Sequence, residues 1–271
     1  MITPNNLKEH LTATLSGRAS DFAKADFWHY TSLEKAKLIL DGDTPGFLAS
    51  SLALMNDLDE SQMHENEKKR VFSLCFCNTK MEKIPMWYMY SDLDGEGVAL
   101  GFTPGKMRDF INSIERVYPF AKGKVKKKKP LRKGVDFEIQ AGWIAYYSPS
   151  TRKNVRFKGE WYDGVPDDFE IDNYFIKSYP WYYEDEFRIV IKFKNECNFD
   201  QVYIELNEKT PVKLMIGPGF NSDKSEKTAI LEELKKSQKI SGVYNSNLQV
   251  NMKLAKRHLN SFISYTVKKC K

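Results

Sequence analysis

One stretch of the sequence decides the fold: Tyr182-Tyr183-Glu184-Asp185-Glu186-Phe187-Arg188-Ile189-Val190-Ile191-Lys192-Phe193. Read with a period of two, it predicts a strand whose apolar face carries Phe187, Ile189, Ile191 and Phe193. The opposite face carries Glu184, Glu186 and Arg188. Alternate residues of a strand lie about 6.6 Å apart, so we expect the two glutamates to reach a common ligand, with Arg188 beside Glu186. The alternative interpretation is an exposed ladder of charges on an edge strand.

The composition is that of a soluble globular protein. The 271 residues are 41% hydrophobic, 13% aromatic and 29% charged. The chain contains no run of eighteen apolar residues, and the segment from Met1 to Arg18 lacks the apolar core of a signal peptide. We therefore expect a cytoplasmic protein without membrane contact. Cys75 and Cys77 have no second pair to complete a zinc site, so buried free thiols and no metal site are expected.

The positive charge of the chain is concentrated in a single run. Residues 122–133 contain eight of the 42 basic residues and no acid, whereas the remaining 34 basic residues are fewer than the 36 acidic ones. A dense lysine run attracts polyanions by counterion release, although such runs are often only solvated. We predict a lysine-rich, nucleic-acid-binding loop at about 122–133, with these residues as contacts: Lys124, Lys126, Lys127, Lys128, Lys129 and Arg132.

The pattern of elements favours a single α+β domain over 1–271. Short strands are spread among helices without regular βαβ alternation. An amphipathic helical arm is expected at about 1–20. Pro104 is expected to begin a helix that reaches about Val117, and another helix is expected at about 167–177. The segment 137–147 reads as one strand.

Several separated motifs follow one another along the chain: His29-Tyr30-Thr31 before a helix, Asn56-Asp57-x-x-Glu60, Met86-Trp87-x-x-Tyr90 followed by Gly97 and Gly101-Phe102, Tyr183-Glu184-x-Glu186-x-Arg188, and the late turn Ile216-Gly217. In order and spacing they resemble one bacterial family, the domain of unknown function 2971, over roughly Phe27 to Leu234. These blocks are in turn similar to parts of the ADP-ribosyltransferase superfamily. That resemblance implies two packed, small, mostly antiparallel sheets flanked by helices.

The resemblance also implies roles for individual residues. A late E-x-E motif has the catalytic glutamate second, which is Glu186 here, with Glu184 before it. The NAD-binding positions that match are His29, Tyr30, Thr31, Ser73, Trp87, Tyr90 and Arg188. The usual Ser-Thr-Ser motif is reduced to Ser73, and the aromatic residue that stacks on nicotinamide is either Trp87 or Tyr90.

The chemistry of NAD explains why such residues are useful. Cleavage between nicotinamide and ribose passes through an oxocarbenium-like state, which a carboxylate near the ribose stabilises. Glu186 is expected in this role, Glu184 would orient or deprotonate the nucleophile, and Arg188 would keep Glu186 ionised or bind a phosphate. We expect an NAD-dependent mono-ADP-ribosyltransferase, a toxin or phage-defence effector that modifies a nucleic acid, with RNA favoured, or a protein. We also expect an antitoxin or other neutralising protein to oppose it.

Two other functions compete with this hypothesis. One is a non-catalytic nucleic-acid-binding module, in which the lysine run binds and the Glu184-x-Glu186-x-Arg188 motif is structural. The other is a metal-dependent nuclease using Asp57, Asp59 and Glu60 together with Glu184 and Glu186, because carboxylates bind divalent cations.

Overall fold

The computed structural model describes residues 25–41, 45–54, 65–92, 95–121, 123–126, 129–147, 154–157, 160–163, 173–207, 209–220 and 225–248. This part of the chain is α+β, with mixed sheets and few helices, which confirms the predicted class at that level. The ADP-ribosyltransferase-like arrangement and the single domain remain predictions. The predicted arm at about 1–20 lies outside the described residues.

The internal contacts of the chain divide it into two compact units. The first comprises Met1–Phe27, Thr44–Lys80 and Thr103–Thr210, and the second comprises Trp28–Asp43, Met81–Phe102 and Pro211–Lys271.

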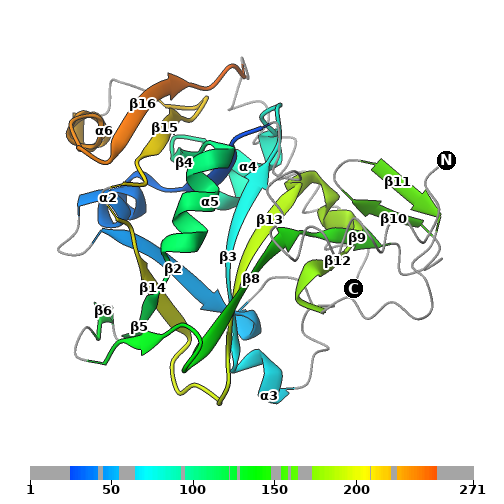
Figure 1. The fold of residues 1–271 in the computed structure, drawn as a ribbon. Coiled ribbons are helices and arrows are strands. Elements are labelled where there is room, and N and C mark those ends of the chain that lie inside the picture. Colours follow the sequence, from blue (N-terminus) through cyan, green and yellow to red (C-terminus); the bar gives the residue numbers. More distant parts are fainter. Residues whose placement is uncertain are drawn as a thin grey trace, which may run out of the picture. The chain divides into compact units, whose positions relative to one another are not determined.

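Strand β13 (Glu186–Phe193) lies inside the main sheet of the first unit (Figure 1). It pairs antiparallel with β3 (Val71–Asn78) on one side and with β8 (Phe137–Trp143) on the other. The sheet continues from β3 through antiparallel pairs: β2 (Gly46–Ser51), β14 (Gln201–Glu205) and β5 (Arg116–Ala121), with the short strands β6 (Lys124–Val125) and β7 (Leu131–Arg132) paired to β5.

The predicted apolar face of β13 is part of the core, as expected. Phe187, Ile189, Ile191 and Phe193 are all buried. Helix α5 (Pro104–Ser113) adds to the core of this unit, because its Phe110 ring lies 5.7 Å from the Phe47 ring of β2.

A second, four-stranded sheet also belongs to the first unit. Its order is β11 (Glu160–Asp163), β10 (Asn154–Phe157), β9 (Ala145–Tyr147) and β12 (Ile176–Ser178), and only the β9–β12 pair is parallel. The remaining elements of the unit are short: η2 (Leu52–Leu54), α3 (Glu65–Lys68), η4 (Asn173–Phe175) and η5 (Tyr179–Glu184).

Three predicted boundaries in this unit are wrong. The segment 137–147 forms two strands in different sheets, β8 and β9. Its pairing with β13 ends where the Ile144 N–H donates to the Glu186 carbonyl at 2.9 Å, and the residues that follow join the four-stranded sheet. Helix α5 begins as predicted, with Thr103 capping and Pro104 in the first turn. It ends at Ser113 and not near Val117, because Val117 already belongs to strand β5, which pairs with β14. Lys177, the expected end of a helix, lies in strand β12.

The second unit combines four strands and three helices within its described part. Its strand order is β16 (Ile240–Asn245), β15 (Val212–Ile216), β4 (Val98–Phe102) and β1 (Phe27–Thr31, of which Phe27 is assigned to the first unit). Strand β15 is parallel to β16 and antiparallel to β4. The helices are α2 (Leu33–Asp41), α4 (Ile84–Tyr90) and α6 (Ser225–Lys235).

Gly217 allows a close backbone approach in this second unit. Its N–H donates to the Gly97 carbonyl at 2.9 Å. A methyl group on Gly217 would collide with the carbonyl oxygens of Gly95 and Gly97, which are backbone atoms and cannot rotate away.

We therefore expect Gly217→Ala to lower the free energy of unfolding by about 1–3 kcal/mol, the usual cost of overpacking. The matched control is Gly105→Ala in α5, where nothing lies within 4 Å of an added methyl group. Denaturant unfolding measures both variants. Equal stability of the two would contradict the steric explanation.

Candidate functional site

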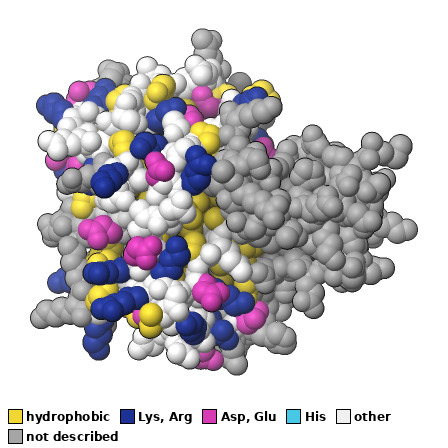
Figure 2. Space-filling model, viewed as in Figure 1, with side chains coloured by type: hydrophobic (Ala, Val, Ile, Leu, Met, Phe, Trp, Pro, Cys, Tyr) yellow, Lys and Arg dark blue, Asp and Glu magenta, His cyan; other side chains and the backbone are white. Residues whose placement is uncertain are grey.

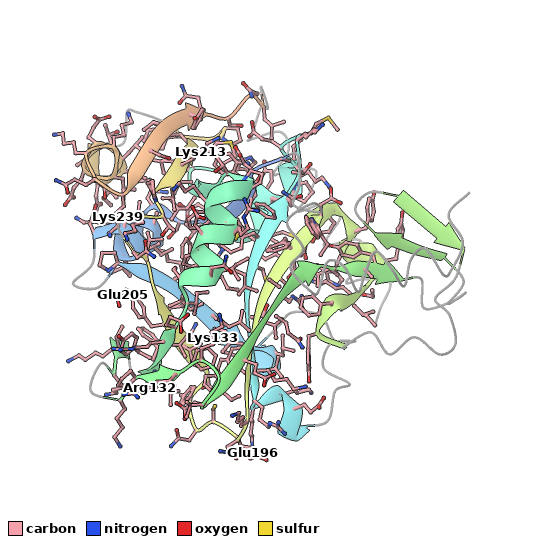
Figure 3. The ribbon with its side chains drawn as sticks, viewed as in Figure 1. Arg132, Lys133, Glu196, Glu205, Lys213 and Lys239 are labelled. Atoms are coloured by element: carbon pink, nitrogen blue, oxygen red, sulfur yellow. The ribbon has the colours of Figure 1, made fainter. Side chains whose placement is uncertain are left out.

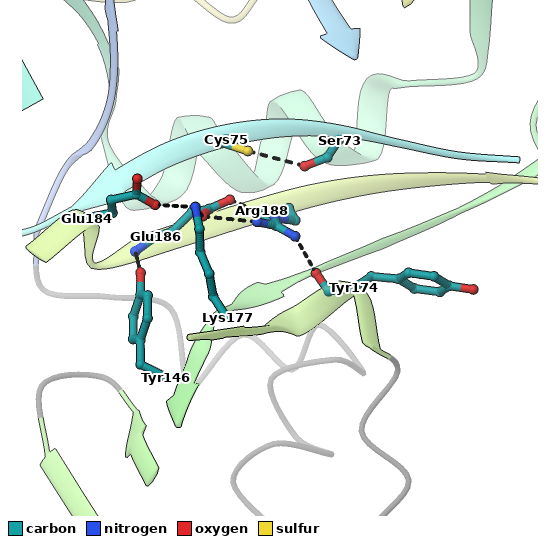
Figure 4. A network of polar contacts seen from close by, with 8 residues as sticks. All are labelled: Ser73, Cys75, Tyr146, Tyr174, Lys177, Glu184, Glu186 and Arg188. Atoms are coloured by element: carbon teal, nitrogen blue, oxygen red, sulfur yellow. Dashed lines mark hydrogen bonds and ion pairs between the residues drawn. The ribbon is translucent and has the colours of Figure 1, made fainter. Parts of the chain in front are cut away.

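The charged face of β13 is buried. Glu186 and Arg188 retain 3% and 0% of their accessible surface. The reason is topological: β13 lies between β3 and β8, and residues of the second sheet approach the same face (Figure 4). The motif is therefore not an exposed ladder on an edge strand.

Glu184 and Glu186 are not alternate residues of one strand, contrary to the prediction. Glu184 ends the 3-10 helix η5, and β13 begins only at Glu186. Between them Asp185 has a φ of 39°, the left-handed conformation that aspartate tolerates better than most residues. This turn changes the chain direction and leaves both carboxylates buried.

Arg188 holds Glu186 through a bidentate ion pair. The guanidinium Nε donates to Glu186 Oε1 at 2.7 Å, and Nη2 donates to Oε2 at 3.1 Å. Its Nη1 donates to the Tyr174 carbonyl at 2.8 Å. The planar fork of arginine matches a carboxylate, which makes this the strong form of an ion pair.

Lys177 joins the two glutamates and was missed by the sequence analysis. Its Nζ lies 2.6 Å from Glu184 Oε2 and 3.3 Å from Glu186 Oε2. Its ammonium also lies 4.8 Å from the centroid of the Trp181 ring. The common ligand predicted for Glu184 and Glu186 is thus a lysine of the chain itself. Glu184, Glu186, Lys177 and Arg188, here called the buried ion cluster, pair two carboxylates with two cations (Figure 4).

The cluster keeps the Glu186 carboxyl ionised. Burial alone would raise its pKa, but the charges of Arg188 and then Lys177 outweigh burial and hold the pKa well below the usual range. The role expected of Arg188, to keep Glu186 ionised, agrees with this geometry.

Tyr146 binds the backbone of Glu186. Its hydroxyl oxygen accepts from the Glu186 N–H at 2.8 Å. Burial and the neighbouring glutamates raise the pKa of Tyr146 well above its ordinary value, so this hydroxyl stays neutral. Tyr146 therefore acts as a fixed hydrogen-bonding group at the start of β13.

Ser73 lies on β3, in the register position opposite Val190 of β13. It is buried, and its hydroxyl lies 3.2 Å from the sulfur of Cys75, which stands opposite Arg188. Burial, followed by the charge of Glu186, raises the pKa of the Cys75 thiol, so it is a protonated thiol and not a nucleophile. Neither Cys75 nor Cys77 belongs to a disulfide bond.

The other predicted NAD-binding residues belong to the second unit. His29, Tyr30 and Thr31 lie on β1, where His29 is partly exposed and the other two are buried. Trp87 and Tyr90 lie on α4.

Of the two aromatic candidates for nicotinamide stacking, Trp87 has the environment of a core residue. It is fully buried, its ring lies 4.7 Å from the Tyr30 ring at 84°, and its Nε1 donates to Glu82. Tyr90 is partly exposed, which favours it over Trp87 for stacking on a ligand.

The lysine run is not a single loop. Lys124 belongs to β6 and Arg132 to β7, and Lys126 and Lys129 lie between these strands. All four are exposed. Lys127 and Lys128 lie outside the described residues.

The acidic turn of the nuclease alternative, Asp57, Asp59 and Glu60, also lies outside them. Within the described ranges, no three His, Cys, Asp or Glu side chains are grouped so that they could hold a metal ion. Nor does any helix there have the length and apolarity needed to cross a membrane.

Comparison of the chain with protein-family models, curated proteins and solved structures gives no match.

Replacing Arg188 should lower the stability of the first unit. Arg188→Met leaves two buried carboxylates facing one lysine, and loss of one partner from a buried pair costs about 3–5 kcal/mol. Arg132→Met, at an exposed position, is the control and should change stability by less than about 0.5 kcal/mol. The double variant Glu186→Gln/Arg188→Met should lose less than the sum of the single variants. Equal stability of Arg188→Met and Arg132→Met would show that the ion pair does not stabilise the fold.

The lowered pKa of Glu186 also predicts how stability depends on pH. Because the folded pKa lies below that of the unfolded chain, about 4.3 for glutamate, the contribution is complete above that value and is lost as the pH falls. Between pH 5 and pH 3, the free energy of unfolding of the native protein should fall more steeply than that of Glu186→Gln. Parallel curves in urea titrations at each pH would contradict this expectation.

Proposed function

We propose that the chain is an NAD-dependent ADP-ribosyltransferase in which Glu186 is the catalytic carboxylate. The observation that supports it best is the ionised state of Glu186, maintained by Arg188 and Lys177 within a buried site. A permanently anionic carboxylate suits electrostatic stabilisation of a cation and does not suit proton donation. The oxocarbenium-like state of the proposed reaction needs electrostatic stabilisation.

The proposed reaction transfers ADP-ribose from NAD to an acceptor. The bond between ribose C1′ and the nicotinamide nitrogen breaks, and its electron pair leaves with nicotinamide. The acceptor atom then forms a bond to C1′ and gives its proton to Glu184. Glu186 stabilises the positive charge on the ribose between these events and accepts a hydrogen bond from the 2′-hydroxyl.

The unequal contacts of Lys177 suggest how the ribose reaches Glu186. The ammonium lies closer to Glu184, at 2.6 Å, than to Glu186, at 3.3 Å. A ribose hydroxyl would replace the longer contact while Lys177 stays with Glu184. Because Glu186 is buried, this requires the Lys177 side chain, and η5 with it, to shift when NAD binds.

The other roles follow the sequence prediction. Glu184 orients the acceptor, and Arg188 keeps Glu186 ionised. The acceptor is RNA, DNA or protein.

Replacing Glu186 by glutamine should greatly slow turnover of NAD. Removal of one preorganised charge that acts on a transition state lowers the rate by about 100-fold or more. The measurement is release of nicotinamide from labelled NAD, with and without added RNA and cell protein. The matched control is Glu196→Gln, an exposed glutamate labelled in Figure 3, which should retain full activity.

Two results would contradict the proposal. One is a native protein that releases no nicotinamide under any of these conditions. The other is a Glu186→Gln variant that remains folded, as its circular dichroism spectrum reports, and is as active as Glu196→Gln.

A further inference from the structure

Strand β5 and its two short neighbours carry a group of exposed basic side chains. Arg116 lies on β5, and the others lie on β6, β7 or beside them: Lys124, Lys126, Lys129, Arg132 and Lys133. In Figure 2, Lys and Arg side chains gather at the lower left, where Figure 1 places β5 and β6. Figure 3 labels Arg132 and Lys133 in that part of the molecule.

The strand register separates these residues into two faces. Arg116 stands directly opposite Arg132, and Phe120 stands opposite Val125. Side chains opposite one another share a face, and so do alternate residues of one strand. One face therefore carries Arg116, Tyr118, Phe120 and Arg132, here called the β5 surface. Lys124 stands opposite Ala121 and belongs to the other face, so the lysine run is not one continuous binding surface.

The β5 surface contains an unfavourable pair of like charges. Side chains directly opposite on antiparallel strands have Cβ atoms about 5 Å apart, and like charges at that distance repel. Among the described residues, neither the Arg116 nor the Arg132 guanidinium forms an ion pair. An anion bound between them would remove the repulsion, and two guanidinium groups are well suited to a phosphate.

Aromatic rings lie on the same face as the arginines. Tyr118 and Phe120 are partly exposed, whereas Val117 on the opposite face is buried. Tyr203 of β14 stands directly opposite Tyr118 and therefore lies on the same face, with ring centroids 6.2 Å apart. A sheet that presents aromatic rings beside basic side chains has the composition of a single-strand binding platform, on which unpaired bases stack while cations hold the backbone.

We propose that the β5 surface binds single-stranded nucleic acid. Arg116 and Arg132 hold a phosphate of the backbone, and Phe120 and Tyr118 stack on bases. The exposed lysines at 124, 126 and 129 add long-range attraction. Paired bases in a duplex cannot stack on these rings, so the rings favour a single strand over a duplex. This binding needs no NAD and goes beyond the proposed transfer reaction, because it holds whether or not the chain turns over NAD.

The experiment is a titration of a fluorescein-labelled oligouridylate of about 15 nucleotides, within the usual size of such sites, followed by fluorescence anisotropy without NAD. Each phosphate contact to a single strand contributes about 0.7 to the slope of log K against log salt concentration. Because the two arginines hold one phosphate, Arg116→Gln/Arg132→Gln should bind more weakly and reduce the slope by about 0.7. Phe120→Leu should weaken binding about tenfold and leave the slope unchanged.

The matched control is Lys80→Gln/Lys236→Gln, which removes the same charge from two exposed lysines outside β5–β7 and should keep the native affinity within twofold. If the arginine variant does not fold, the affinity of Phe120→Leu still tests the proposal. Three results would overturn the proposal: equal weakening by the control, a duplex bound as tightly as the single strand, or binding only to vesicles of anionic lipid.

Discussion

The bidentate ion pair between Arg188 and Glu186 is the interaction on which the first unit depends. Both side chains are buried, at 0% and 3% exposure, so each would be costly to leave without its partner. Their partners come from both sheets: Arg188 and Glu186 lie on β13, Lys177 on β12 and Tyr146 on β9. The main sheet and the four-stranded sheet must therefore meet at one position for every charge to be compensated.

The same constraint determines what the site can do chemically. A buried carboxylate without cations would be protonated at neutral pH, and an exposed one would be screened by water. Glu186 avoids both outcomes because Arg188 and Lys177 stabilise its charge at a buried position. In our proposal this is the state in which a carboxylate stabilises an oxocarbenium ion most effectively. The contact between Glu186 and Lys177, at 3.3 Å, is the one that a ribose hydroxyl would replace.

The sequence predicts the strand but not its surroundings. Alternation places Phe187, Ile189 and Ile191 in the core correctly, since a period of two is a local property. The burial of Glu186 and the role of Lys177 depend on pairing with β3 and on a second sheet, which are contacts between distant parts of the chain. The positive φ of Asp185, which separates Glu184 from the strand, also has no clear signal in a Glu-Asp-Glu run. The sequence likewise predicts the lysine run as one loop, whereas β6 and β7 divide it and Arg116 of β5 stands opposite Arg132.

The pH dependence of nicotinamide release tests the central claim most directly, because it reports the charge of Glu186 during the reaction itself. If an ionised Glu186 stabilises the transition state, the single-turnover rate should not fall between pH 8 and pH 5, since the pKa of this carboxyl lies well below that range. A rate that falls with an apparent pKa between 5 and 7, and does so only while Glu186 is present, would contradict the account. It would mean that this carboxyl takes up a proton where Arg188 and Lys177 are expected to keep it charged.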